Sequence, residues 1–157
     1  TNETIFELAE RPKHLLIIGG GPIGLEMAQA HHRLGCQVTV IEGAQVLAKD
    51  DPDAAAVLVQ ALRDEGITIE ENALAAKVSG GDGAIEVAAQ DGRVFKGSHL
   101  LVAVGRKPNI AKLNLEAAGI ATQRGSIAVN AALKTSNRRV YAIGDVVGGL
   151  QFTHMAG

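Results

Sequence analysis

Three glycines have the spacing of a site that binds phosphate groups. Gly19, Gly21 and Gly24 follow the apolar run "LLII" and precede a segment whose apolar residues recur at helical spacing. In such a loop, glycine permits a tight turn, close approach of a pyrophosphate and close packing of helix on strand. The helix that starts at Pro22 and Ile23 then offers the free backbone N–H groups of its first turn to an anion. We therefore expect a dinucleotide-binding loop, the alternative being a glycine-rich turn without a ligand.

Glu42 bears on which dinucleotide would bind. It ends a second apolar run, "QVTVI", where a carboxylate accepts hydrogen bonds from the adenosine ribose hydroxyls and repels a 2′-phosphate. An NADP site would instead need arginines in the following stretch, "EGAQVLAKDD", whose one cation is Lys49. The pattern predicts NAD(H) as the cofactor.

The elements that must position these residues alternate regularly. Short apolar runs of strand length are separated by two helical segments, and together they predict strand, helix, strand, helix and strand at 14–18, 22–34, 37–41, 52–65 and 67–70. This βαβαβ order requires a parallel sheet with right-handed crossovers.

The pattern changes after residue 72. "ALAAKVSG", "AIEVAAQ" and "RVFKG" alternate apolar and polar residues between glycine-rich turns, which predicts a three-stranded antiparallel meander. Further strands are expected at 99–105, 126–130 and 139–145, and a weak helix at 111–119. The fold class is therefore α/β: a Rossmann-like βαβαβ parallel sheet with helices on both faces, an inserted meander and a C-terminal segment.

Composition argues against several other classes of protein. The 157 residues have a net charge of −2, which gives no basic footprint for nucleic acid or anionic lipid. No apolar run approaches the roughly 20 residues of a membrane span, and the first ten residues lack the pattern of a signal peptide. We expect no nucleic-acid or membrane partner.

Cysteine and histidine provide no metal or redox site by spacing. Cys36 is the single cysteine, so we expect a buried, inert thiol and a reducing, cytoplasmic setting. His31 and His32 are adjacent on the expected helix and point about 100° apart, so they cannot share a metal ion. We expect no metal site in this chain.

Beyond these elements, the chain resembles the FAD-dependent pyridine nucleotide–disulfide oxidoreductases. The resemblance lies in "GGGPIGLEMAQAHHRLGCQVTVIE", "GDGAIEVAAQDG", "LLVAVGRKPN" and "VYAIGDV", in this order. It covers essentially the whole chain and is strongest toward dihydrolipoyl dehydrogenases and mercuric-reductase-like flavoproteins. The pairing of "AVGRKPN" with "YAIGD" is its most specific part.

The resemblance implies that the chain is a middle portion of a longer flavoprotein. Residues 1–12 would be a lead-in from a missing FAD domain, 13–134 the NAD(H)-binding domain, and 135–157 a segment returning to the FAD domain. Partners would be the missing FAD and dimerisation domains, with a homodimer formed by the full-length protein. The redox cysteines and the catalytic histidine of the family would lie outside this sequence, so no catalytic residue is expected here.

The resemblance also implies roles around the nicotinamide. Glu26 matches a glutamate near the nicotinamide, although an interaction with the helix dipole is an equally good explanation. Pro22 stands where relatives often have a bulkier residue that gates the pocket, which leaves the gating mechanism open. Gly105, in the "GRKPN" loop, matches backbone close to NAD.

FAD contacts are implied for the C-terminal segment. Gly144 and Asp145 match the motif whose aspartate holds a hydroxyl of the flavin ribityl chain, the alternative being that Asp145 only caps a turn. Thr153 and His154 match the start of a helix facing the isoalloxazine.

The expected function is to place the nicotinamide for hydride transfer to or from FAD, with the isolated chain inactive. Two alternatives remain: an NAD-sensing Rossmann module without redox chemistry, and the NAD domain of an NADH oxidase, coenzyme A-disulfide reductase or nitrite-reductase-type flavoprotein. The electron acceptor cannot be inferred from the residues present.

Overall fold

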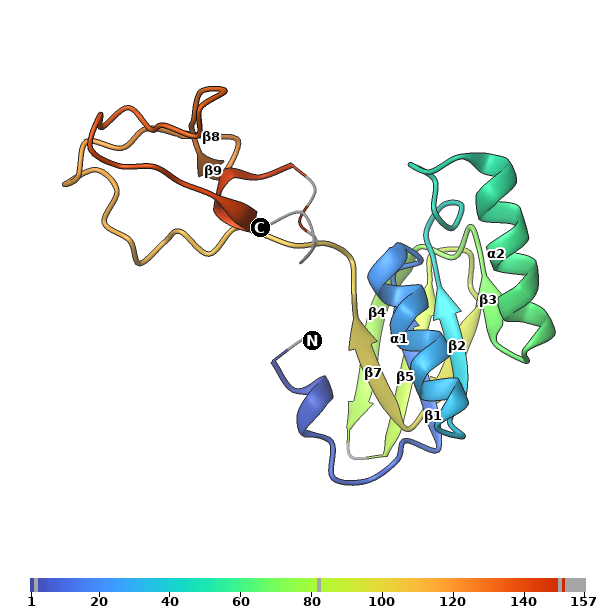
Figure 1. The fold of residues 1–157 in the computed structure, drawn as a ribbon. Coiled ribbons are helices and arrows are strands. Elements are labelled where there is room, and N and C mark those ends of the chain that lie inside the picture. The colour runs from blue at the N-terminus through green and yellow to red at the C-terminus, as the bar shows by residue number, and fades with distance from the viewer. Residues whose placement is uncertain (2, 82, 150, 152–157) are drawn as a thin grey trace. The chain divides into compact units, whose positions relative to one another are not determined.

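The structure, a computed structural model, describes residues 1, 3–81, 83–149 and 151 and divides into two compact units (Figure 1). Unit 1 is Thr1–Gly105 and unit 2 is Arg106–Gly157. This division lies earlier than the expected domain boundary after residue 134, because the parallel sheet ends with the strand His99–Val102. The functional domain to which residues 106–134 belong stays a prediction.

A four-stranded parallel sheet forms the centre of unit 1. Its strand order is β3-β2-β1-β7, so β1 lies between β2 and β7. In register, Ile18 at the end of β1 faces Ile41 on one side and Val102 on the other. The carboxyl ends of three strands therefore meet at the glycine loop. The strand bounds are β1 His14–Ile18, β2 Gln37–Ile41, β3 Thr68–Glu70 and β7 His99–Val102.

Both helices of unit 1 begin where the sequence predicts. Helix α1 covers Pro22–Arg33 and helix α2 covers Pro52–Asp64. Asp51 caps α2 through its side chain, which accepts hydrogen bonds from the amides of Asp53 and Ala54. The apolar faces of the two helices pack on one face of the sheet, forming a core with Leu15, Ile17, Leu25, Ala28, Val38, Val40, Val59 and Leu62.

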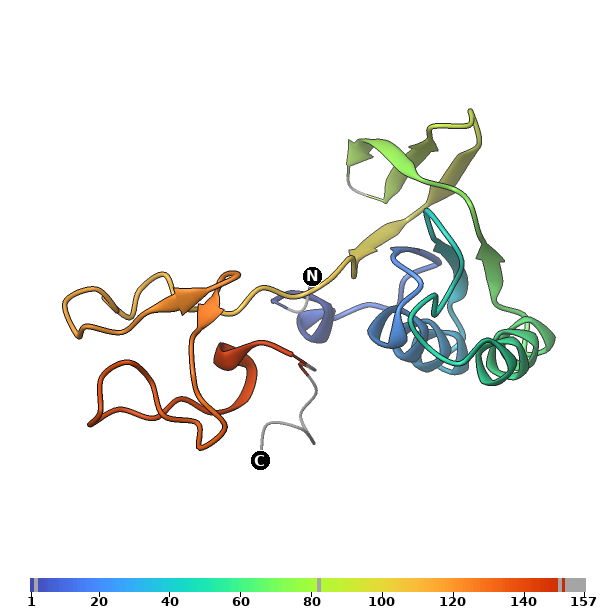
Figure 2. The same cartoon turned by 90° about the horizontal axis from the view of Figure 1, so that it is seen from above.

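The antiparallel meander covers the other face of the parallel sheet. It consists of β4 (Ala75–Gly81), β5 (Ala84–Ala89) and β6 (Val94–Gly97), and a second buried cluster joins Val87 and Ala89 to Leu16 and Ile41. Figure 2 shows the helices and the meander on opposite sides of the sheet. The α/β class and the meander are confirmed. Among the described residues, however, both helices lie on one face rather than on two.

Unit 2 contains less regular structure than the sequence predicts. It has the short pair β8 (Thr122–Gln123) and β9 (Ser126–Ile127), and the 3-10 helix η2 (Gly144–Val147). The expected strand 126–130 ends at Ile127, because its partner β8 offers only two residues for pairing. The chain then turns at Asn130, whose side chain accepts hydrogen bonds from the amides of Ala132 and Lys134.

Two further expectations in unit 2 are wrong. The strand expected at 139–145 is reduced to an isolated bridge between Lys134 and Tyr141, followed by a turn at Gly144, whose φ is +71°. The helix expected at 111–119 is a series of turns.

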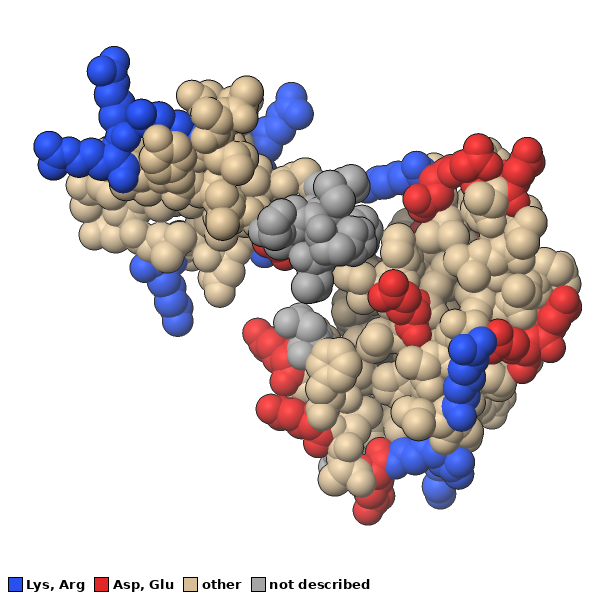
Figure 3. Space-filling model, in the orientation of Figure 1, with Lys and Arg blue, Asp and Glu red and all other residues tan. Residues whose placement is uncertain are grey.

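Charge is unevenly divided between the two units. Residues 1–105 contain eight Lys or Arg and fifteen Asp or Glu, whereas residues 106–157 contain seven and two. On the face shown in Figure 3, acidic side chains are prominent on unit 1 and basic ones on unit 2. The small net charge of the whole chain therefore results from an acidic unit and a basic unit.

Candidate functional site

Two of the three motif glycines are required by packing. Gly19 has φ +114°, and a Cβ atom there would lie 2.5 Å from the carbonyl oxygen of Ala103, just beyond β7. A Cβ atom at Gly24 would collide with the carbonyl oxygen of Gly19. The first and third glycines thus allow the loop, the strand and helix α1 to approach closely.

Gly21 differs, because a Cβ atom there would have no atom within 4 Å. It is the N-cap of α1, with φ −78°, a conformation open to any residue. Gly21 has no side chain that could cap the helix, and Pro22 has no N–H. The amides of the residues that follow Pro22 in the first turn are therefore left for another acceptor. Accessible backbone at a helix N-terminus fits the pyrophosphate of a dinucleotide.

Glu42 lies at the carboxyl end of β2, beside this loop. It is half-buried, and its Oε2 accepts a hydrogen bond from the Gly20 amide at 2.6 Å while its Oε1 accepts one from the Ala44 amide at 3.0 Å. Each carboxylate oxygen has a further lone pair for a hydroxyl donor. The carboxylate is therefore held in place and can still accept from a ribose.

Sequence reasoning missed Gly20, which the motif treats as a variable position. A Cβ atom there would lie 2.8 Å from Cγ2 of Val46 and 3.1 Å from Cβ of Glu42. The middle glycine of "GGG" was the available signal.

The other residues that the sequence suggests for NAD binding lie in different surroundings. Glu26 is exposed and is the fifth residue of α1, beyond its first turn, which weakens the helix-dipole explanation. Pro22 and Ile23 form the start of the helix, as expected. Gly105 has φ +136° and open space around it, so its conformation favours glycine while packing does not require it.

The second candidate group lies within unit 2. Asp145 is in η2, and its Oδ2 lies 3.4 Å from Nη1 of Arg106, which also donates to the Gln151 carbonyl at 2.6 Å. Nothing in the sequence predicts this contact of Arg106. Thr153 and His154 lie outside the described residues.

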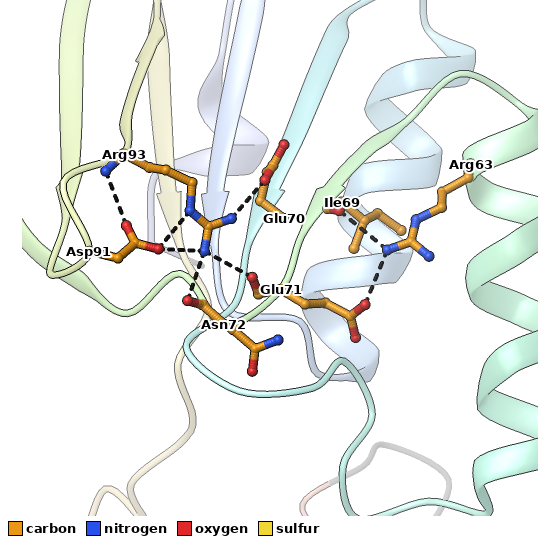
Figure 4. Close-up of polar contacts among 7 residues, drawn as sticks. All are labelled: Arg63, Ile69, Glu70, Glu71, Asn72, Asp91 and Arg93. Carbon is orange, nitrogen blue, oxygen red and sulfur yellow. Dashed lines mark hydrogen bonds and ion pairs between the residues drawn. The ribbon is translucent and has the colours of Figure 1, made fainter.

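An arginine that the sequence did not single out fastens the meander to the parallel sheet (Figure 4). Arg93 pairs with Asp91 at 2.7 Å and Glu70 at 2.9 Å, and donates to the carbonyls of Glu71 and Asn72. Its hydrogen bond to Asp91 raises the pKa of Arg93 and lowers the pKa of Asp91. The sequence Asp-Gly-Arg indicates a turn, but nothing in it identifies the distant partners of Arg93.

Cys36 and His14 have structural environments. Cys36 is 2% exposed, and burial raises the pKa of its thiol. Burial lowers the pKa of His14, whose ring nitrogen lies 2.9 Å from the hydroxyl of Thr39. Among residues 1, 3–81, 83–149 and 151, no group of three or more metal-binding side chains comes together. In the same part of the chain, no helix is long and apolar enough to cross a membrane.

Comparison with known proteins identifies the family. The family model for pyridine nucleotide-disulphide oxidoreductases matches residues 1–157, and the chain belongs to this family. Similar proteins include a mercuric reductase of Lysinibacillus sphaericus (39% identity, 99% of this chain and 30% of the relative). A dihydrolipoyl dehydrogenase of Thermus scotoductus is 43% identical over 92% of this chain and 33% of its own.

Solved structures agree with this assignment. The HOCl-induced flavoprotein disulfide reductase RclA from Escherichia coli matches with a TM-score of 0.88 and 37% identity, over 97% of this chain and 35% of that chain. LpdA from Mycobacterium tuberculosis matches with a TM-score of 0.86 and 36% identity, over 97% and 34%. The chain thus spans about a third of the length of these relatives.

Proposed function

We propose that this chain is the NAD(H)-binding portion of an FAD-dependent disulfide oxidoreductase. The observation that carries the proposal is the accessible backbone at Gly21 beside a fixed carboxylate, Glu42, at the carboxyl ends of adjacent parallel strands. Family membership adds a flavin partner, since relatives with this fold include flavoprotein disulfide reductases. We also propose that the full-length protein is a dimeric flavoprotein.

The residues of this chain would act by binding and orientation. Amides of the first turn of α1 would hold the pyrophosphate, and Glu42 would accept hydrogen bonds from the adenosine ribose. Gly105 and Glu26 would border the nicotinamide, and the Gly144–Asp145 turn would hold the flavin ribityl chain. The bound flavin and nicotinamide supply the hydride-transfer chemistry.

Replacing Glu42 tests the nucleotide assignment. A hydrogen bond to a charged group contributes about 1.5–3 kcal/mol, so Glu42→Ala should weaken NADH binding roughly tenfold to a hundredfold. NADH fluorescence titrations of both proteins, repeated with NADPH, measure the change. Wild-type protein that prefers NADPH would contradict the proposal.

The isolated chain should bind FAD hardly at all and should not reduce disulfide substrates, because it spans only about a third of the length of its flavoprotein relatives. The absorbance spectrum of the purified protein checks the first point. One equivalent of bound flavin would show that this 157-residue chain already contains a sufficient FAD site.

A further inference from the structure

The loop after β2 contacts Gly20 and Glu42, the two groups that would face the nucleotide. In residues 43–47, the Ala44 amide donates to Glu42, and the Leu47 amide donates to the Gly20 carbonyl at 3.1 Å. Val46 is 5% exposed and contacts the position of Gly20. The direction of the Glu42 carboxylate therefore depends on the position of this loop.

The loop is itself fastened by the segment that follows β3. Oε1 of Glu71 accepts a hydrogen bond from the Val46 amide at 2.9 Å, and the Asn72 amide donates to the Ala44 carbonyl at 2.9 Å. Leu47 has φ +54°, a conformation unfavourable for leucine, so the loop needs such attachments to keep its shape.

Two arginines hold Glu71 from opposite sides (Figure 4). From α2, Nη2 of Arg63 lies 3.1 Å from Oε2 of Glu71, which leaves Oε1 for the Val46 amide. From the meander, Nη2 of Arg93 donates to the Glu71 carbonyl at 3.0 Å. A helix, a strand end and the meander thus meet at one residue, with Arg63 bound to the side chain of Glu71 and Arg93 to its backbone carbonyl.

We propose that Glu71 is a positioning residue for the adenosine end of the dinucleotide. This inference rests on the proposed function and deepens it. The two carboxylate oxygens of Glu71 have partners within the protein, the Val46 amide and Arg63. Glu71 therefore acts through Val46, which contacts the position of Gly20 and so keeps Gly20 and Glu42 in place. The carboxylate of Glu71 thereby raises nucleotide affinity without contacting the nucleotide.

Two replacements at this position separate the hydrogen bond from the charge. Glu71→Ala removes the acceptor of the Val46 amide, so that amide should exchange its hydrogen faster. Fewer molecules then have the binding-competent loop, and affinities for NADH and ADP-ribose should both fall about threefold to tenfold. Glu71→Gln keeps an acceptor oxygen and should restore most of both properties.

Glu86→Ala is the matched control, because it removes a carboxylate from an exposed ion pair, with Lys96 of the meander, away from the loop. Titrations with NADH and ADP-ribose, and amide exchange by NMR, are measured on the whole 157-residue chain. Glu86→Ala should match wild type in both readouts.

Three results would overturn the inference: unchanged ADP-ribose affinity in Glu71→Ala, unchanged Val46 exchange, or an equal loss in Glu86→Ala. Failure of the proposed function looks different. In that case wild-type protein binds neither NADH nor ADP-ribose, although Val46 exchange still rises in Glu71→Ala, and the assignment of Glu71 to a nucleotide falls with it.

Discussion

At the scale of single residues, replacing different glycines of the loop should affect nucleotide binding and folding separately. Gly21→Ala adds a methyl group in open space at an ordinary φ, so thermal stability should change by less than about 1 kcal/mol. NADH affinity should fall, because the added carbon would lie where we propose that the pyrophosphate approaches the backbone. Thermal unfolding and an NADH titration of this variant measure the two effects.

Gly24→Ala should instead lower the stability of the fold. Its added carbon would meet the Gly19 carbonyl, and forcing atoms into such a packed position costs about 1–3 kcal/mol or more. The unfolding midpoint should drop clearly in this variant. If Gly21→Ala unfolded as early as Gly24→Ala, the different roles assigned to the two glycines would be wrong.

At the scale of elements, the attachment of the meander depends on Arg93. Arg93→Met should lower the unfolding midpoint at pH 7, because Met keeps the aliphatic stem but loses every donor to Asp91, Glu70 and the two carbonyls. Urea or thermal unfolding followed by circular dichroism measures this difference between variant and wild type.

The pH dependence of that difference follows from Asp91. Its pKa is lowered in the folded protein, mainly by Arg93, so the pair stabilises the fold fully above the ordinary pKa of 3.8. The contribution is lost as the pH falls from there through the folded-state pKa. The gap between Arg93→Met and wild type should therefore narrow in acid. A gap that widened below pH 3.8 would contradict this origin.

The elements of unit 1 could be predicted because each has a local signal. Buried parallel strands appear as continuous apolar runs, and Asp51 followed by Pro52 marks the start of α2. Which faces the helices cover is not a local property. It depends on strand order, since successive right-handed crossovers in one direction place their helices on the same side of a sheet.

The site was predictable only in part for the same reason. Gly19, Gly24 and Glu42 have a known spacing, and their surroundings fit the roles expected from it. Arg93 and Glu71 have no such pattern, because their partners lie on other elements and depend on the folded arrangement. In unit 2, short apolar stretches suggested strands, but strand pairing there is limited to two residue pairs in β8–β9 and an isolated bridge at Tyr141.

At the scale of the whole molecule, the proposed NAD residues all belong to the acidic unit. A shortened chain of residues 1–107 should therefore keep the unfolding midpoint of unit 1 and the NADH affinity of the full chain, because Gly19, Glu42 and both core clusters lie within it. It should also bind more tightly to an anion exchanger at pH 7, having lost a net positive segment.

Calorimetry, NADH titration and ion-exchange chromatography of the shortened chain check these three properties. A shortened chain that is unfolded would mean that unit 2 is needed for the stability of unit 1.

The order of strands in the parallel sheet has a consequence for synthesis of the chain. Strand β1 is made shortly before one neighbour, β2, whereas its other neighbour, β7, is made much later. Until residue 102 has been made, one edge of β1 is unpaired and the sheet face that receives the meander is uncovered. At a synthesis rate of about 5–20 residues per second, this interval lasts several seconds. During it the nascent chain exposes an unpaired, aggregation-prone strand edge that a ribosome-bound chaperone could shield.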